Sequence, residues 1–228
     1  MVGYAGSQLD NDYGSIIIGA QFGDVADVNG KISLANVAPI AEGELTADDL
    51  IGNITFQLLN NFGGTVEGSD RIWNGTKWTD ESGVDMSSDS YDAGQGLCVY
   101  NAADPDVGKV LFRTSGQVNE FDVIVKLDDD FGSVLIANPY PSQVKLSSMI
   151  PTSDSEDIAG NVTFQKVNNF GGTIEGSDRI WNGTKWTMED GSDASDEVLA
   201  PGEGICVYNS VDPEDGLVTL RFTAPKIN

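Results

Sequence analysis

Short apolar runs, each bounded by Gly, Asn, Asp or Pro, recur along the whole chain. They are rich in β-branched and aromatic residues, which favour strands, and they include residues 16–19, 53–59, 97–100 and 110–114. No stretch keeps a helical period over three turns. The run at 97–100 is apolar on both faces, so we expect a central strand there. The pattern predicts an all-β fold.

The chain repeats itself. Residues 53–79 recur without a gap at 161–187, with 23 of 27 positions identical. Upstream, residues 9–18 resemble 127–136 at an offset of 118 instead of 108, so the first copy carries about ten additional residues. We infer an internal duplication. It predicts two tandem homologous β-sandwich or partly open barrel modules, residues 1–118 and 119–228, each with roughly six to eight strands.

Within each copy an Asn-Gly pair stands between tryptophans, at Asn74-Gly75 and again at Asn182-Gly183. Asn-Gly between aromatic residues predicts a β-hairpin. The tryptophans of these segments have two interpretations, core packing and flat platforms for sugar rings, and we favour the core because aromatic cross-strand pairs ordinarily stabilise sheets. They are Trp73, Trp78, Trp181 and Trp186.

Charge is the compositional feature that most limits the possible partners of this protein. The chain has 36 acidic and 12 basic residues and a formal net charge of −24. Nucleic acid and anionic membranes both require a cationic surface, so we expect neither as a partner. The excess of acidic residues also has a simpler explanation, either a solvated acidic surface or adaptation to high salt. No apolar run approaches the roughly 20 residues that span a bilayer.

The chain contains no histidine. Catalytic triads, His-ligated zinc and the usual neutral-pH proton shuttle are therefore excluded, and carboxylate pairs, as in glycosidases, are the remaining enzymatic chemistry. We expect no enzyme. Cys98 and Cys206 occupy equivalent positions in the two copies, too far apart for a disulfide, so we expect buried free thiols. Glycosylation is left open at four Asn-x-Thr sites: Asn53, Asn74, Asn161 and Asn182.

Acidic clusters that end in glycine are the candidate metal sites. Three segments read Asp-x-Asp-x-Gly and a fourth is a close variant, and alternate carboxylates before a glycine bend can converge on Ca²⁺. The alternative is that Asp and Gly build tight turns. The candidate ligands are Asp10, Asp12, Asp104, Asp106, Asp128, Asp130, Asp212 and Asp215.

The second copy carries a further pattern. An apolar strand leads into Asn138-Pro139-Tyr140-Pro141, and a Gly-x-Gly segment at 202–204 precedes a hydrophobic strand. This pattern resembles β-repeat modules of secreted bacterial cell-surface proteins, although the first copy lacks the Asn-Pro turn. The resemblance implies an extracellular or cell-surface location and a structural or adhesive role. Because residues 1–6 lack the features of a signal peptide, we expect a processed N-terminus.

These observations favour an extracellular structural protein that assembles with copies of itself into a filament, sheath or surface layer, with calcium support. We expect head-to-tail strand complementation, in which a free opening strand at 2–9 pairs with the exposed closing strand at 218–222 of another chain. The alternative is an adhesion module that binds carbohydrate or another partner. A glycoside-processing enzyme is third.

Overall fold

The computed structural model describes residues 2–9, 15–19, 21–22, 31–58, 66–127, 132–153, 158–167, 173–212, 214 and 216–226. In these segments the all-β prediction is confirmed, since the regular elements are strands and short 3-10 turns. The turns are η1 (Leu34–Asn36), η2 (Ala47–Leu50) and η3 (Leu146–Ser148).

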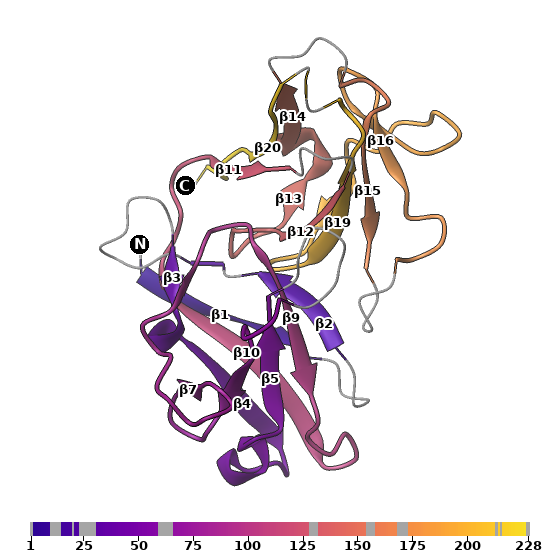
Figure 1. Ribbon diagram of the computed structural model, residues 1–228. Coiled ribbons are helices and arrows are strands. Elements are labelled where there is room, and N and C mark those ends of the chain that lie inside the picture. Colours follow the sequence, from indigo (N-terminus) through magenta and orange to yellow (C-terminus); the bar gives the residue numbers. More distant parts are fainter. Residues whose placement is uncertain are drawn as a thin grey trace.

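Residues 2–117, the N-terminal half, form three antiparallel sheets (Figure 1). Their strand orders are β1-β10-β4, β2-β9-β5-β6-β7 and β3-β8. The strands are β1 (Val2–Gln8), β2 (Ser15–Gly19), β3 (Ile32–Ser33), β4 (Val37–Gly43), β5 (Ile54–Gln57), β6 (Arg71–Trp73), β7 (Trp78–Thr79), β8 (Ser90–Tyr91), β9 (Gly96–Asn101) and β10 (Gly108–Gln117). The apolar run at 97–100 lies in β9, which has a neighbour on each side, as expected.

Residues 123–226, the C-terminal half, have the same three strand orders, β11-β20-β14, β12-β19-β15-β16-β17 and β13-β18. The strands are β11 (Val123–Lys126), β12 (Ser133–Ala137), β13 (Val144–Lys145), β14 (Met149–Ser153), β15 (Val162–Lys166), β16 (Arg179–Trp181), β17 (Trp186–Thr187), β18 (Val198–Leu199), β19 (Gly204–Asn209) and β20 (Val218–Phe222). Each half thus has ten described strands, more than predicted, because two-residue strands such as β3 leave too little pattern in the sequence.

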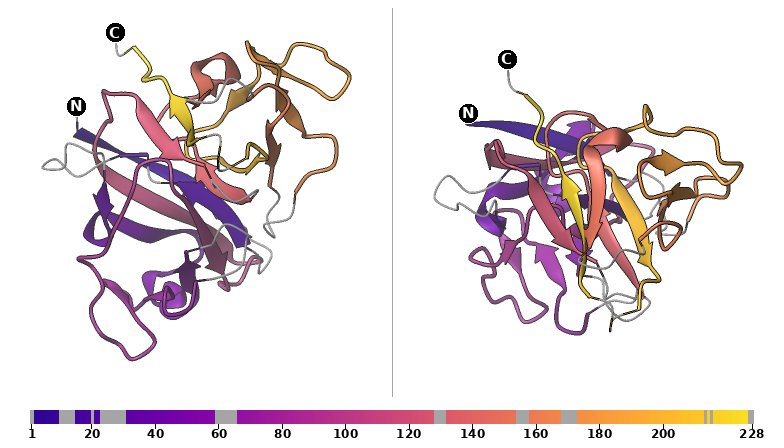
Figure 2. Two further views of the ribbon diagram at one scale, coloured as in Figure 1. Left: turned by 45° about the horizontal axis from the view of Figure 1, so that its top comes forward. Right: turned by 90° about the horizontal axis from the view of Figure 1, so that it is seen from above.

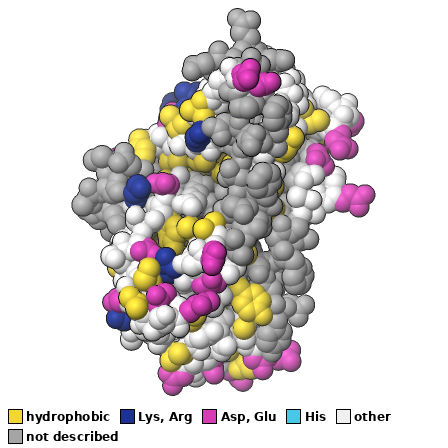
Figure 3. Space-filling model, in the orientation of Figure 1, with side chains coloured by type: hydrophobic (Ala, Val, Ile, Leu, Met, Phe, Trp, Pro, Cys, Tyr) yellow, Lys and Arg dark blue, Asp and Glu magenta, His cyan; other side chains and the backbone are white. Residues whose placement is uncertain are grey.

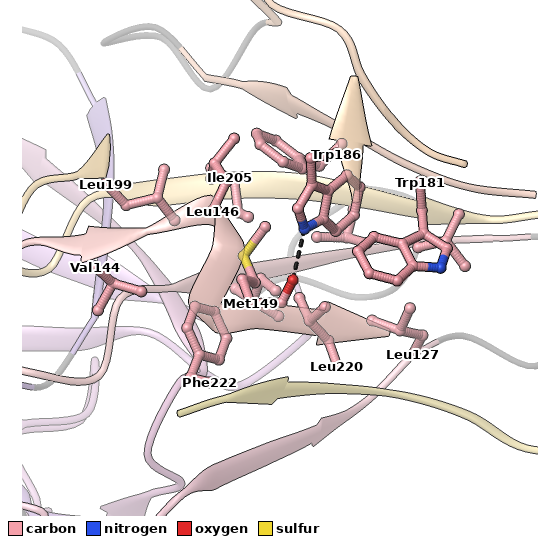
Figure 4. Packing of buried hydrophobic residues seen from close by; sticks show 14 of the residues in the cluster. Leu127, Val144, Leu146, Met149, Trp181, Trp186, Leu199, Ile205, Leu220 and Phe222 are labelled. Carbon is pink, nitrogen blue, oxygen red and sulfur yellow. Dashed lines mark hydrogen bonds between the residues drawn. The ribbon is translucent and has the colours of Figure 1, made fainter. Parts of the chain in front are cut away.

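Each half has its own hydrophobic cluster, to which its five-stranded and three-stranded sheets both contribute. In the C-terminal half the indole Nε1 of Trp186 donates to the carbonyl oxygen of Met149 at 2.5 Å, beside Trp181 (Figure 4). In the N-terminal half Trp78 donates to the Val37 carbonyl at 2.8 Å. These bonds connect the two sheets and satisfy a buried donor. All four tryptophans are buried, as the core interpretation predicts.

The predicted Asn-Gly hairpin is confirmed between β6 and β7. The amide of Asn74 donates to the Lys77 carbonyl, while Asn74 Oδ1 accepts from the amides of Thr76 and Lys77. Gly75 follows with a φ of 99°, which favours glycine. The connection therefore spans Asn74 to Lys77 and is longer than a two-residue turn. Asn182 makes the corresponding bonds between β16 and β17.

The opening strand is not free. β1 pairs along its whole length with β10, from Val2 opposite Gln117 to Gln8 opposite Leu111. The expectation of an unpaired segment at 2–9 is therefore wrong for residues 2–8. Local sequence could not show this, because the partner strand is more than a hundred residues away and offers both edges, one to β1 and one to β4. The expectation of an exposed strand at 218–222 is wrong as well, because this strand lies between two paired neighbours at the centre of its sheet.

The two halves meet through a pseudo-twofold contact in which β2 and β12 lie close together (Figure 2). The amide of Gly19 donates to the Gly202 carbonyl at 3.1 Å, and the amide of Ala137 donates to the Gly94 carbonyl at 2.9 Å. Gly19 corresponds to Ala137, and Gly94 to Gly202, so each half gives and receives the same bond. An arrangement of this kind is isologous and closed, unlike a head-to-tail contact.

Glycines allow this contact. A Cβ added at Gly204 would lie 2.5 Å from the carbonyl oxygen of Ile17, and one added at Gly96 would lie 2.9 Å from that of Leu135. Real Cβ atoms cannot approach a carbonyl oxygen so closely. The backbones of the two halves therefore come together only because these positions have no side chain.

Tyr140 joins three segments of the C-terminal half. The side chain is fully buried, and its hydroxyl accepts from the Val123 amide at 3.2 Å. The same oxygen lies 2.9 Å from the carbonyl oxygens of Phe121 and Phe222, to one of which it donates. The position corresponds to Phe22 in the N-terminal half, which is also buried and has no hydroxyl.

We expect Tyr140→Phe to lower the free energy of unfolding by about 1–3 kcal/mol, because buried backbone groups lose their partner. Burial raises the pKa of Tyr140 to about 12 from its usual 10.0. Its contribution is therefore complete below pH 10 and is lost as the pH rises toward 12, and Tyr140→Phe removes this part of the alkaline dependence. Urea titrations at pH 8 and pH 11, with Tyr208→Phe as an exposed control, measure both effects. Equal midpoints for Tyr140→Phe and wild type would contradict this role.

Gly204→Ala tests the junction. We expect the added methyl group to push the halves apart, to increase the radius of gyration in small-angle X-ray scattering and to cost about 1–3 kcal/mol. Gly6→Ala is the matched control, because its Cβ meets only side-chain atoms of Leu111 at 3.6 Å. An unchanged scattering profile and stability for Gly204→Ala would show that the contact is unimportant.

Candidate functional site

The described residues include three of the eight candidate metal ligands, Asp104, Asp106 and Asp212. Asp104 Oδ1 accepts from the Asp106 amide at 3.0 Å, and Asp212 Oδ1 accepts from the Glu214 amide at 2.9 Å. Both are Asx turns, so turn formation accounts for these two aspartates. Among the described residues no three metal-binding side chains cluster. The other candidates lie outside the described residues: Asp10, Asp12, Asp128, Asp130 and Asp215.

Calcium binding stays a prediction, with a clear test. Acidic loops that bind a cation in the folded state raise the melting temperature in millimolar Ca²⁺ relative to EDTA. Asp104→Asn keeps the side-chain oxygen that accepts the hydrogen bond of the turn, but it removes the negative charge that a cation would need. Asp104→Ala removes both the oxygen and the charge. We expect Asp104→Asn to reduce the calcium-dependent shift and to melt like wild type in EDTA. Superimposable wild-type melting curves in the two buffers would refute calcium support.

The outward face of each five-stranded sheet carries the same set of polar and aromatic side chains. On β5 and β9 of the N-terminal half Ile54, Phe56 and Val99 point into the core, so the alternate residues point outward. The outward residues are Thr55, Gln57, Cys98 and Tyr100, joined by Asp70 next to β6. Their counterparts are Thr163, Gln165, Cys206, Tyr208 and Asp178.

In the C-terminal half this face is hollowed into a shallow cavity of about 280 Å³, with Tyr208 as its exposed aromatic residue. Gln165 Nε2 donates to Asp178 Oδ1 at 2.6 Å. That bond leaves Gln165 Oε1 and Asp178 Oδ2 to accept from a ligand. Burial raises the pKa of the Cys206 thiol, and the hydrogen bond with Ser133 opposes this only in part. The cavity offers a ring face beside several hydrogen-bonding groups.

The N-terminal half repeats the central pair, since Gln57 Nε2 donates to Asp70 Oδ1 at 2.5 Å. Tyr100 and Tyr208 are each 40% exposed. The sequence analysis missed this face because it considered only the tryptophans as surfaces on which a sugar ring could stack. The alternation of apolar and polar residues along β5 and β9 could have indicated it. Cys98 and Cys206 are not joined in a disulfide, as expected, but both are partly exposed, so the prediction that they are buried is wrong.

An exposed ion pair lies beside each hairpin, at one end of each five-stranded sheet. The Lys77 ammonium lies 2.7 Å from Asp85 and lowers the pKa of that carboxyl to about 2. Lys185 and Asp193 form the same pair at 2.6 Å. Acidic side chains otherwise dominate the charged surface, as they do at the lower end of the N-terminal half in Figure 3. Asn74 and Asn182 are exposed at the hairpin turns, where the bonds they make need no glycan.

No family model matches the chain, and no curated protein is significantly similar to it. In the part of the chain that the structure describes, no helix is long and apolar enough to cross a membrane. The surfaces of the protein are therefore the basis for assigning a function.

Proposed function

We propose that this chain is an extracellular adhesion module that arose by internal duplication, with copies at 1–118 and 119–228, and that it binds glycans without transforming them. The observation that carries the proposal is the duplicated outward face around Tyr100 and Tyr208. Each face presents an aromatic ring next to an amide–carboxylate pair. A pyranose has an apolar face of C–H groups and a rim of hydroxyls, so it matches this combination.

Because the face is present twice in one molecule, the protein can bind two ligands at once. The halves are in contact through paired backbone bonds at Gly19 and Ala137. Two weak sites at a fixed spacing bind a surface that repeats its ligand far more tightly than either site alone. This effect suits attachment to a polysaccharide layer, and the acidic surface keeps the protein away from nucleic acid and anionic lipid.

Self-assembly into a filament, sheath or surface layer is a second proposal. Because β1 is a terminal strand at a sheet edge, its exchange between chains would make the same pairing with β10 between molecules. Cations that screen the charge of −24 would favour such association. This route replaces the donation of an unpaired strand.

The adhesion proposal predicts that each tyrosine supports one site. On a glycan array and on immobilised polysaccharide, we expect Tyr208→Ala or Tyr100→Ala alone to weaken apparent binding about 100-fold through lost bivalency, and the double variant to abolish it. Ile174→Ala, a change at an exposed hydrophobic residue outside these faces, is the control. Glycan binding that survives the double variant would place the site elsewhere, and a wild-type protein that binds no glycan would end the proposal.

A further inference from the structure

A groove runs along the junction of the two halves, with a volume of about 560 Å³. We call it the junction groove. One wall is the loop before β9, and the other is β11 with the segment that precedes it, while β12 contributes the remainder. Its lining residues are Asp92, Ala93, Gln95, Phe121–Lys126 and Val134–Ile136. The groove is continuous with the interface between the halves, because Gly94 packs directly against Val125.

The junction groove exposes large apolar side chains. Ile124 is 62% exposed, more than any other large hydrophobic residue described, and Phe121 is 40% exposed. Val125, Val134 and Leu135 add partly buried apolar surface. Exposed apolar side chains that line one groove typically mark an interaction site.

The other half of the protein has a groove at the corresponding position, which can be compared with the junction groove. The pseudo-twofold relation carries the junction groove onto a second groove of about 350 Å³, lined by β1, β2 and the loop before β19. There Gly3 and Gly6 stand where β11 and its approach carry Phe121 and Ile124, and Ser7 replaces Val125. Ser7 accepts a hydrogen bond from Gln21 at 2.9 Å. The strand β1 therefore lacks the two large apolar side chains of the junction groove, although Ile17, Ile18 and Val167 line the second groove.

β11 also presents an open backbone edge. Among the described strands it is the last of its sheet and pairs with β20 alone. The Leu127 amide donates to the Val218 carbonyl at 3.0 Å, so Leu127 and, two residues earlier, Val125 form the hydrogen-bonded pairs. By the same alternation Ile124, which precedes Val125, belongs to a non-hydrogen-bonded pair. In an antiparallel ladder such a residue directs its N–H and C=O away from the partner strand, here β20. Backbone groups and apolar side chains thus stand together along one strand.

Charge distinguishes the two ends of β11. Asp92 and Asp122 lie at its beginning, with side chains 67% and 40% exposed. Asp92 pairs with Lys31 at 3.1 Å, while Asp122 lies 3.9 Å from Arg221 and accepts from the Ala224 amide. Lys126 is exposed at the other end. A complementary strand would carry basic residues beside the aspartates.

We propose that the junction groove binds an extended peptide segment of another protein, which adds to β11 as a further strand. Its backbone pairs with Ile124, its alternate apolar side chains cover Phe121 and Ile124, and its basic end lies beside Asp92 and Asp122. Main-chain bonds provide affinity and alternate side chains provide specificity in this mode of recognition. The site is separate from the tyrosine faces, so it does not depend on glycan binding.

The test uses the full chain and a labelled ten-residue peptide of alternating valine and threonine with two lysines at one end, in fluorescence polarisation. We expect Ile124→Ser to weaken binding at least tenfold, and Ile174→Ser, at an exposed site outside the groove, to leave it unchanged. A peptide N-methylated at alternate amides should also bind at least tenfold more weakly, because it cannot extend the sheet.

Several results would overturn the proposal. These are absence of binding to wild type, equal binding by Ile124→Ser, and equal binding of the N-methylated peptide. A concentration-dependent dimer that Ile124→Ser abolishes, measured by light scattering, would show that a second copy covers the groove. Near-ultraviolet circular dichroism of Ile124→Ser, together with unchanged glycan binding, separates a local effect from misfolding.

Discussion

The arrangement of the two halves depends on how closely their backbones approach at Gly96 and Gly204. Each glycine faces a carbonyl oxygen of the other half, at a distance that excludes any Cβ. Because the contact is made twice with exchanged partners, it closes on itself and leaves no complementary end to propagate. It also places the loops before β9 and β19 beside β11 and β1, which creates the two related grooves. Without these glycines the halves would have to meet in another way.

Within each half the indole hydrogen bond has the comparable role. Trp78 and Trp186 belong to five-stranded sheets, yet their Nε1 atoms donate to carbonyl groups of β4 or its counterpart β14. A buried N–H without a partner is costly, so this bond restricts where the three-stranded sheet can lie. The apolar cluster supplies most of the stabilisation, and the indole bond makes one packing arrangement preferable. The outward faces can then vary in side chain without disturbing the core.

Sequence pattern predicted local features well and long-range pairing poorly. The strand at 97–100, the Asn-Gly hairpins and the buried tryptophans all follow from composition within a few residues, and each is confirmed. The pairing of β1 with β10 was missed because strands that lack a strong apolar alternation can join any available edge. The face around Tyr208 was missed for a related reason. Its residues come from several strands, and only the sheet register brings Asp178 and Gln165 together.

The tyrosine faces and the grooves differ in how similar they are between the two halves. The tyrosine faces carry the same side chains twice, which is useful when one ligand repeats, as in a polysaccharide. The grooves are related in position but differ in size and in the strand that lines them, since Ile124 and Phe121 stand where the other half has glycine. In the junction groove these exposed apolar side chains lie beside an open strand edge, and that combination favours a partner that is itself a strand.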